Sequence, residues 1–179
     1  MPDSPVLYGA TTPEGAFAET VAGFRPSATL IAAFTAAGAT PLPTLGVVPA
    51  DWRLSRRLRR FSTEGALPFV DIEAPATHTY LIQQASGLLA ARGPSTLDVS
   101  QVRGPSRTLT RGLSSWFYSR TDEHGQPLYA GIRYVSRLGD HECWAVFDGT
   151  DVALHSSEPI TAGHHALHAV ATVYGLTIE

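Results

Sequence analysis

Apolar and polar positions follow strand or helix spacing over most of the chain, and they predict a succession of short elements. In the first 72 residues the pattern predicts strands at 6–8 and 69–72 and a helix at 13–22, with Thr12 as its N-cap and Pro13 at its first position. For two stretches the pattern does not decide between strand and helix. Residues 29–37 fit a strand or a weak helix, and residues 52–61 fit a strand or a basic amphipathic helix.

The second half of the chain has clearer periodicity. Helices are predicted at 75–92, 106–119 and 164–174, and strands at 97–99, 129–136, 142–147 and 176–178. Residues 138–140 form a turn between two strands, and the second of these, 142–147, is almost wholly apolar, so we expect it to be central with Cys143 in the core. The mixture predicts an α/β (α+β) fold, and the absence of repeats and linkers predicts one domain over residues 1–179.

The composition of the chain argues against several classes of protein. Hydrophobic residues make up 44% and charged residues 16% of the 179 positions, as in compact folded proteins, and the net charge of −3 argues against direct nucleic-acid binding. No apolar run approaches the roughly 20 residues of a membrane helix, and the first residues do not resemble a signal peptide. With a single cysteine, these features predict a cytoplasmic protein without a membrane segment.

The chain contains no lysine, so all 13 basic residues are arginines. A phosphate-binding P-loop and a lysine Schiff base are therefore excluded. Arginine is left as the only strong side-chain cation for binding phosphate.

Two residues near the start are candidates for chemistry. Glu19 lies nearly opposite the apolar stripe of the helix at 13–22, which is typical of a solvated carboxylate. Gly15 and Gly23 flank it one helical turn away on each side, which would also leave room for a ligand. Tyr8 fits either a half-buried strand aromatic or a site residue.

A third candidate is Ser136, at the end of the strand at 129–136. Alternation places Ile132, Tyr134 and Ser136 on one face of that strand. A serine among apolar neighbours beside a turn fits a hydroxyl that contacts a ligand, and it equally fits an ordinary edge-strand serine.

Two further clusters are weaker candidates for a site. Five arginines lie between residues 53 and 60, and they fit a solvated face better than a surface for an acidic protein or a nucleic acid. His164 and His168 have the i, i+4 spacing of metal ligands, but no nearby carboxylate or cysteine completes a set, so we predict no metal site.

The ordered motifs of the chain resemble the RES domain family. The resemblance rests on Leu-Tyr-Gly-Ala at 7–10 with Glu19 eleven residues after Tyr8, on Asp98-Val-Ser, on Arg107 with Leu109-Thr110, and on Gly-Ile-Arg-Tyr-Val-Ser-Arg at 131–137 before Cys-Trp-Ala-Val-Phe at 143–147. Family members are similar in fold to ADP-ribosyltransferases. The resemblance therefore implies two small mixed β-sheets with flanking helices.

The resemblance also implies an activity and its residues. Many RES proteins are toxins of toxin–antitoxin pairs that cleave NAD⁺ and are neutralised by an Xre-type antitoxin. The resemblance implies that Glu19 and Ser136 are catalytic residues and that Tyr8, Ser136 and Arg107 contact NAD⁺. NAD⁺ is then the substrate, and no cofactor is implied. A degenerate domain that binds a nucleotide or a protein partner is the alternative.

The family arginine presents a discrepancy. It lies upstream of the family tyrosine, whereas the seven residues before Tyr8 contain no arginine. A shortened chain, a degenerate member or a substitute arginine would each account for this, with Arg107, Arg111 and Arg25 as candidates for the substitute. A missing N-terminal segment would expose a sheet edge, so we expect a homo-oligomer or a bound partner to cover it.

Overall fold

The computed structural model describes residues 6–39, 45–93 and 95–179. The chain divides into two compact units. The first unit combines the chain up to Thr11 with Thr63–Ala153, and the second combines Thr12–Ser62 with Leu154–Glu179. Each unit has a hydrophobic core of its own.

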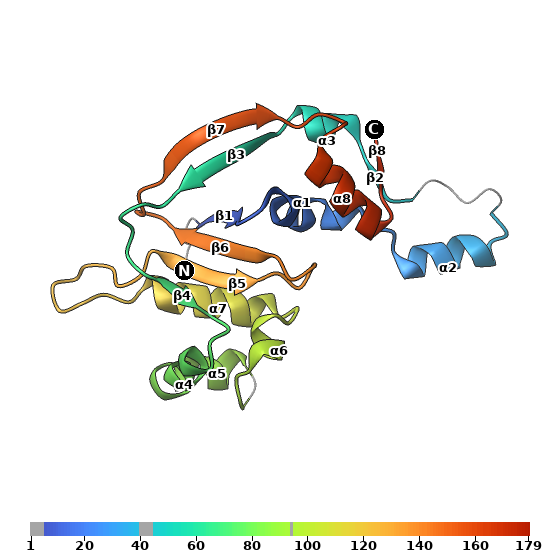
Figure 1. Cartoon of the computed structure of the whole chain (residues 1–179). Coiled ribbons are helices and arrows are strands. Elements are labelled where there is room, and N and C mark those ends of the chain that lie inside the picture. The colour runs from blue at the N-terminus through green and yellow to red at the C-terminus, as the bar shows by residue number, and fades with distance from the viewer. Residues whose placement is uncertain (1–5, 40–44, 94) are drawn as a thin grey trace. The chain divides into compact units, whose positions relative to one another are not determined.

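A four-stranded sheet organises the first unit (Figure 1). Its strands are β1 (Val6–Ala10), β6 (Glu142–Phe147), β5 (Gly131–Val135) and β4 (Phe69–Asp71), in that spatial order. β6 runs antiparallel to both β1 and β5, whereas β4 and β5 are parallel. The central place of β6 and the complete burial of Cys143 confirm what its apolar sequence predicts.

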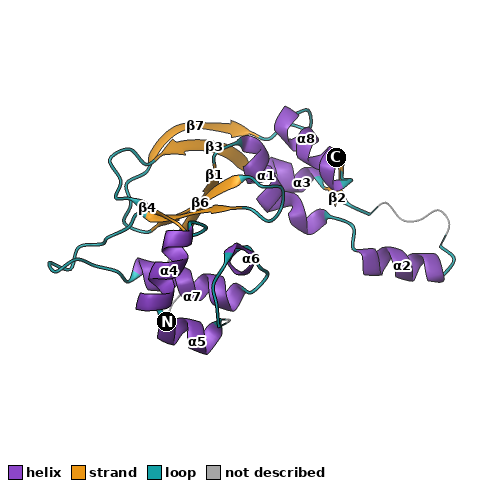
Figure 2. Cartoon of the chain, turned by 60° about the horizontal axis from the view of Figure 1, so that its bottom comes forward, coloured by secondary structure: helices purple, strands orange, loops and turns teal. Residues whose placement is uncertain are grey.

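Four helices accompany the sheet of the first unit (Figures 1 and 2). They are α4 (Pro75–Gln84), α5 (Ser86–Arg92), α6 (Val99–Val102) and α7 (Arg107–Tyr118). Buried side chains of α4, α5 and α7 pack with Ile132 and Ala145 of the sheet. One face of the sheet is therefore sealed by helices.

The second unit is built from helices and two small sheets. Its helices are α1 (Pro13–Val21), the short 3-10 helix η1 (Ala22–Phe24), α2 (Ala28–Ala36), α3 (Ala50–Leu54) and α8 (His165–Tyr174). β2 (Val47–Val48) pairs in parallel with β8 (Thr177–Ile178), and β3 (Arg57–Ser62) pairs with β7 (Ala153–Pro159). Phe17 and Val21 of α1 are buried with Leu167 and Val170 of α8.

The structure confirms the expected mixed α/β fold of small sheets and flanking helices, with three sheets in the described residues. It resolves both open stretches: residues 28–36 are helical, and residues 50–62 form α3 followed by β3. The strand predicted at 97–99 is wrong, because the Asp98 side chain accepts a hydrogen bond from the Gln101 N–H and begins α6. No helix in the described ranges is long and apolar enough to cross a membrane.

Candidate functional site

Tyr8 lies on β1, at an edge of the four-stranded sheet. It pairs with Ala145 of β6, and the residue is 68% exposed. The exposure comes from the edge position, since the strand alternation places Tyr8 on the same face as buried Ala145. An exposed phenol on this strand is free to contact a ligand.

Ser136 lies in the turn that joins β5 to β6. Its N–H donates to the His141 carbonyl at 2.8 Å, and its own carbonyl accepts from the Asp140 N–H at 3.2 Å. Its Oγ accepts a hydrogen bond from the Leu138 N–H at 2.9 Å, and the residue is only 1% exposed. In this structure the Ser136 hydroxyl therefore organises the turn.

Tyr8 and Ser136 belong to the same sheet face but do not touch. Tyr8 is level with Ala145 and Ile132, and Ser136 follows Ile132 by four positions on a strand two places away. Strand spacing and rise put their Cα atoms about 16 Å apart. One small group cannot reach both side chains, and Ile132 and Ala145, which lie between them on this face, are packed against helices.

Glu19 lies on α1 in the second unit. Thr12 caps this helix as predicted, since its Oγ1 accepts from the Gly15 N–H at 3.2 Å. The Glu19 side chain is exposed, and its carboxylate accepts no hydrogen bond and forms no ion pair within the described part of the chain. A Cβ at Gly23 would meet nothing within 4 Å, but Gly15 is buried, so only one of the two flanking glycines leaves open space.

Arg25 and Tyr174 complete the surroundings of Glu19 in the second unit. The Arg25 guanidinium lies over the Tyr174 ring, 5.0 Å from its centroid. Burial raises the pKa of Tyr174, and the negative charge of Glu19 raises it further while Arg25 lowers it. The Glu19 carboxylate is thus close enough for its charge to act on the Tyr174 hydroxyl.

Arg107, the predicted NAD⁺ contact, is the first residue of α7 and is exposed. Arg111 lies one turn later on the same helix and is also exposed. No hydrogen bond or ion pair links either arginine to Tyr8 or Ser136 in the described residues. Arg107 therefore stays a prediction.

A polar network crosses one end of the four-stranded sheet. The Thr11 hydroxyl, just after β1, donates a hydrogen bond to Glu142 Oε1 at 2.8 Å. Arg133 of β5 donates from Nε and Nη2 to the other carboxylate oxygen, Glu142 Oε2. Its Nη1 donates to both oxygens of Asp71. We call these four residues the edge network. It ties all four strands together at the end where β1, β4 and β5 finish.

A second cluster holds the turn that contains Ser136. Arg103 donates to both oxygens of Glu73, from Nε at 2.9 Å and from Nη2 at 2.8 Å, while its Nη1 donates to Asp140 Oδ1 at 2.9 Å. Glu73 Oε1 also accepts the Val135 N–H at 2.8 Å. We call Glu73, Arg103 and Asp140 the turn clamp, because it contacts the chain on both sides of Ser136.

The charges of both clusters are mutually stabilised. The hydrogen bonds from Arg103 lower the pKa of Glu73 despite its burial, and those from Arg133 lower the pKa of Glu142. The same contacts raise the pKa of each arginine. Glu73, Glu142, Arg103 and Arg133 are therefore held in their charged forms.

Sequence reasoning did not predict either cluster. The sequence did contain a signal for them. Asp71 lies near the end of a predicted strand and Glu73 just after it, where polar side chains from neighbouring strands meet. The residues of the turn clamp are up to 67 positions apart, and no local pattern pairs them.

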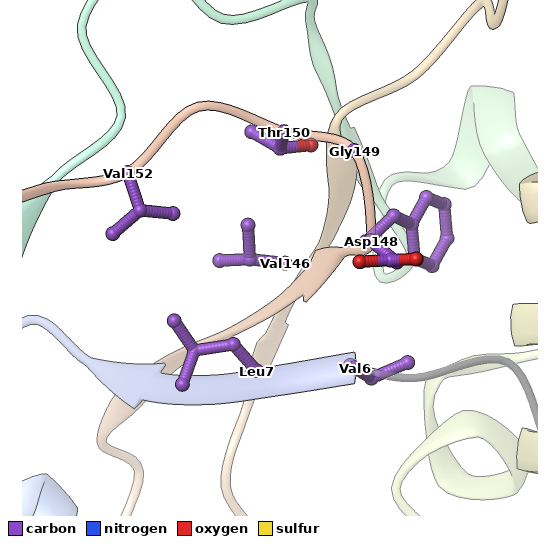
Figure 3. Close-up of a pocket in the computed structure, with 8 residues that line it drawn as sticks. Val6, Leu7, Val146, Asp148, Gly149, Thr150 and Val152 are labelled. Atoms are coloured by element: carbon purple, nitrogen blue, oxygen red, sulfur yellow. The ribbon is translucent and has the colours of Figure 1, made fainter.

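An open hollow lies where β1 and β6 meet the loop after β6 (Figure 3). Its volume is about 370 Å³, and Leu7, Val146 and Val152 give it an apolar lining, with Asp148 and Thr150 at its border. Figure 3 shows the side chains of Leu7, Val146 and Val152 converging on the same space. None of the predicted site residues lines it.

The two minor clusters have structural contacts. Arg53 is buried and donates to the Ile160 carbonyl, Arg56 stacks on Trp52, and Arg57 donates to Ser157. His168 donates to the Ala162 carbonyl at 2.7 Å rather than pairing with His164. Among the described residues, no three His, Cys, Asp or Glu side chains are grouped so that they could hold a metal ion.

Comparison with known families identifies the class of protein. The RES domain matches residues 2–168, which include Tyr8, Glu19 and Ser136. The chain therefore belongs to the RES domain family, a family known from toxin–antitoxin systems. No curated protein and no solved structure gives a significant match.

Proposed function

We propose that this RES domain cleaves NAD⁺ at the bond between nicotinamide and ribose. The observation that carries the proposal is the exposed Glu19 carboxylate, which has no hydrogen-bond or ion-pair partner in the described residues and lies within the stretch matched by the family. A carboxylate held in this state on a capped helix is available to a cationic transition state.

The chemistry needs little from the protein except charge and position. The C1′–N bond breaks with its electron pair leaving on nicotinamide, which departs as a neutral molecule and needs no proton. The ribose is left with positive charge shared between C1′ and the ring oxygen. Glu19 accepts hydrogen bonds from ribose hydroxyls and faces this charge, as carboxylates do in glycoside hydrolysis.

The other predicted residues take positioning roles in this proposal. Tyr8 packs against or hydrogen-bonds the nicotinamide ribose, and Ser136 orients ribose or phosphate oxygens. Water, inorganic phosphate or a protein side chain then adds to C1′ and loses a proton, which gives hydrolysis, phosphorolysis or ADP-ribosyl transfer. In each case the bond to nicotinamide breaks first or in the same step.

The biological role we propose is that of a toxin controlled by a protein antitoxin of the Xre type. The family's toxin–antitoxin setting supports this role. We also propose that the chain associates with itself through the exposed strand β1, where Tyr8 and Leu7 are both accessible.

Expression in a bacterial host tests the function. Wild-type protein should deplete cellular NAD⁺ and stop growth, and Glu19→Gln should abolish both effects because the amide cannot face the developing charge. Glu14→Gln on the same helix is the matched control and should behave as the wild type. Equal NAD⁺ loss with wild type and Glu19→Gln would remove Glu19 from the mechanism, and no loss with either would favour a non-catalytic binding domain.

A further inference from the structure

The two edges of the Arg103 guanidinium have unequal partners. One edge, Nε and Nη2, is held by both oxygens of Glu73, and the other edge presents Nη1 to Asp140 Oδ1. The Glu73 side chain is 12% exposed, whereas the Asp140 side chain is 83% exposed. One carboxylate is thus a fixed support, and the other is a solvent-facing contact.

The contact with Asp140 is easy to replace. A single hydrogen-bonded pair with a mostly exposed carboxylate adds little stability, because water competes for both groups. Glu73 is different, since it also accepts the Val135 N–H and cannot move without breaking that bond. A competing anion would therefore displace Asp140 and leave Arg103 fixed by Glu73.

The Arg103 edge that contacts Asp140 lies next to the turn that contains Ser136. The Asp140 N–H donates to the Ser136 carbonyl, and Val135, bonded to Glu73, directly precedes Ser136. An anionic oxygen that took the place of Asp140 Oδ1 would thus lie against the turn that carries Ser136. Arg103 is 32% exposed at its side chain, so such an oxygen can reach it from solvent.

We propose that Arg103 binds the pyrophosphate of the dinucleotide and that Asp140 is a carboxylate that occupies this position until the substrate displaces it. The inference rests on the proposed function, because it takes its ligand from NAD⁺. Guanidinium groups bind phosphate oxygens through paired hydrogen bonds, and a carboxylate presents the same kind of oxygen acceptor. This assigns a phosphate-binding arginine that the sequence motifs do not indicate.

Arg133 is a weaker candidate for the same role. Its guanidinium is occupied on both sides by Glu142 and Asp71, whose side chains are 35% and 47% exposed. Both partners are therefore better shielded than Asp140. The edge network therefore fits a structural role. In the turn clamp, by contrast, a ligand oxygen can take the place of Asp140 on Arg103.

Asp140→Asn tests the inference directly. Asp140 has a φ of 55°, in the left-handed region that asparagine also tolerates, so the turn is kept while the competing charge is removed. Calorimetry on the full chain should show ADP-ribose binding about fivefold more tightly than to the wild type, as expected for removal of an exposed competing pair. KM for NAD⁺ should fall, with kcat nearly unchanged. Asp151→Asn, at another exposed aspartate, should leave both values as in the wild type.

Arg103→Lys gives the opposite expectation. One ammonium cannot hold Glu73 and also present a second edge to phosphate, so ADP-ribose and inorganic pyrophosphate should both bind about tenfold more weakly. An ADP-ribose affinity unchanged by both Asp140→Asn and Arg103→Lys would overturn the inference. If Glu19→Gln still abolishes NAD⁺ loss in that case, the proposed function stands alone. If the wild type binds no ADP-ribose, the inference fails, and nicotinamide release from NAD⁺ by the wild type decides the proposed function separately.

Discussion

At the scale of single residues, Glu73 has several partners. Its carboxylate is largely buried, accepts two hydrogen bonds from Arg103 and one from Val135, and lies two residues after the last strand residue, Asp71. A buried carboxylate stays charged only when such donors replace the lost water. Glu73 is therefore expected to contribute to stability only while it is ionised.

Glu73→Gln should destabilise the protein by about 2 kcal/mol at pH 7, because a buried charged hydrogen-bonding group is replaced by a neutral one. The pKa of Glu73 is lowered in the folded protein, chiefly by Arg103, below its ordinary value of 4.5. The unfolded chain then binds the proton more readily. This contribution is thus present above about pH 4.5 and is lost as the pH falls through the folded-state pKa.

Urea unfolding of wild type and Glu73→Gln at pH 7 and near pH 3.5 measures this effect. The difference in unfolding free energy should be largest at pH 7 and should shrink at the acidic pH. Glu64→Gln, at an exposed glutamate, is the control and should change little at either pH. A difference that is the same at both pH values would mean that the ionised form of Glu73 is not what stabilises the turn.

At the scale of elements, strong periodicity and capping residues were reliable guides. α1 begins after Thr12 and α7 covers nearly the predicted 106–119, because a local side-chain cap starts each helix and an apolar stripe seals it. β5 and β6 also follow their patterns. In each of these elements local preference and burial agree.

The prediction failed where local preference and tertiary contacts differ. The helix expected at 75–92 is broken at Ala85, whose φ of −122° separates α4 from α5, although Ala85 itself is a good helix former. β7 was missed because its sequence, Ala-Leu-His-Ser-Ser-Glu-Pro, is mostly polar and its residues are largely exposed. Its pairing with β3, about 100 residues away, is not visible in local sequence.

Gly131 is a tightly packed position of the four-stranded sheet. A Cβ there would overlap the Ala145 carbonyl oxygen of β6 and would lie 2.6 Å from Cε1 of the Phe69 ring. Backbone of a central strand cannot move aside cheaply. Gly131→Ala should therefore cost about 3 kcal/mol or more of unfolding free energy.

Gly87→Ala is the matched control for this prediction. Gly87 lies in α5, and a Cβ there would meet nothing within 4 Å, so the change should stabilise the protein by about 0.5–1 kcal/mol through helix preference. Thermal unfolding of both variants measures the contrast. A Gly131→Ala protein as stable as the wild type would show that β5 and β6 are not packed as closely as described.

At the scale of the whole molecule, the candidate residues divide between two units. Tyr8, Ser136 and Arg107 belong to the first, and Glu19 to the second. The sequence predicted these residues through ordered motifs and a family resemblance, and the family is confirmed. It did not predict the turn clamp, because Glu73, Arg103 and Asp140 become neighbours only through the fold.

The exposed strand β1 leads to a prediction on assembly. Within the described residues β1 pairs only with β6, and it carries no charge or proline that would discourage a further strand. Light scattering should therefore give a mass above the 19.1 kDa of one chain, and Leu7→Arg should lower it towards one chain by adding charge to the edge. A wild-type protein that stays monomeric at tens of micromolar would contradict self-association through β1.

The most direct test of the central claim is the release of nicotinamide from NAD⁺ by the purified full chain, followed by chromatography with and without inorganic phosphate. We expect nicotinamide to form in proportion to enzyme and time with the wild type, and not with Glu19→Gln. The co-product identifies the acceptor: ADP-ribose for water, its 1″-phosphate for phosphate, or a modified protein. Intact NAD⁺ after prolonged incubation with folded wild-type protein under all these conditions would contradict the claim.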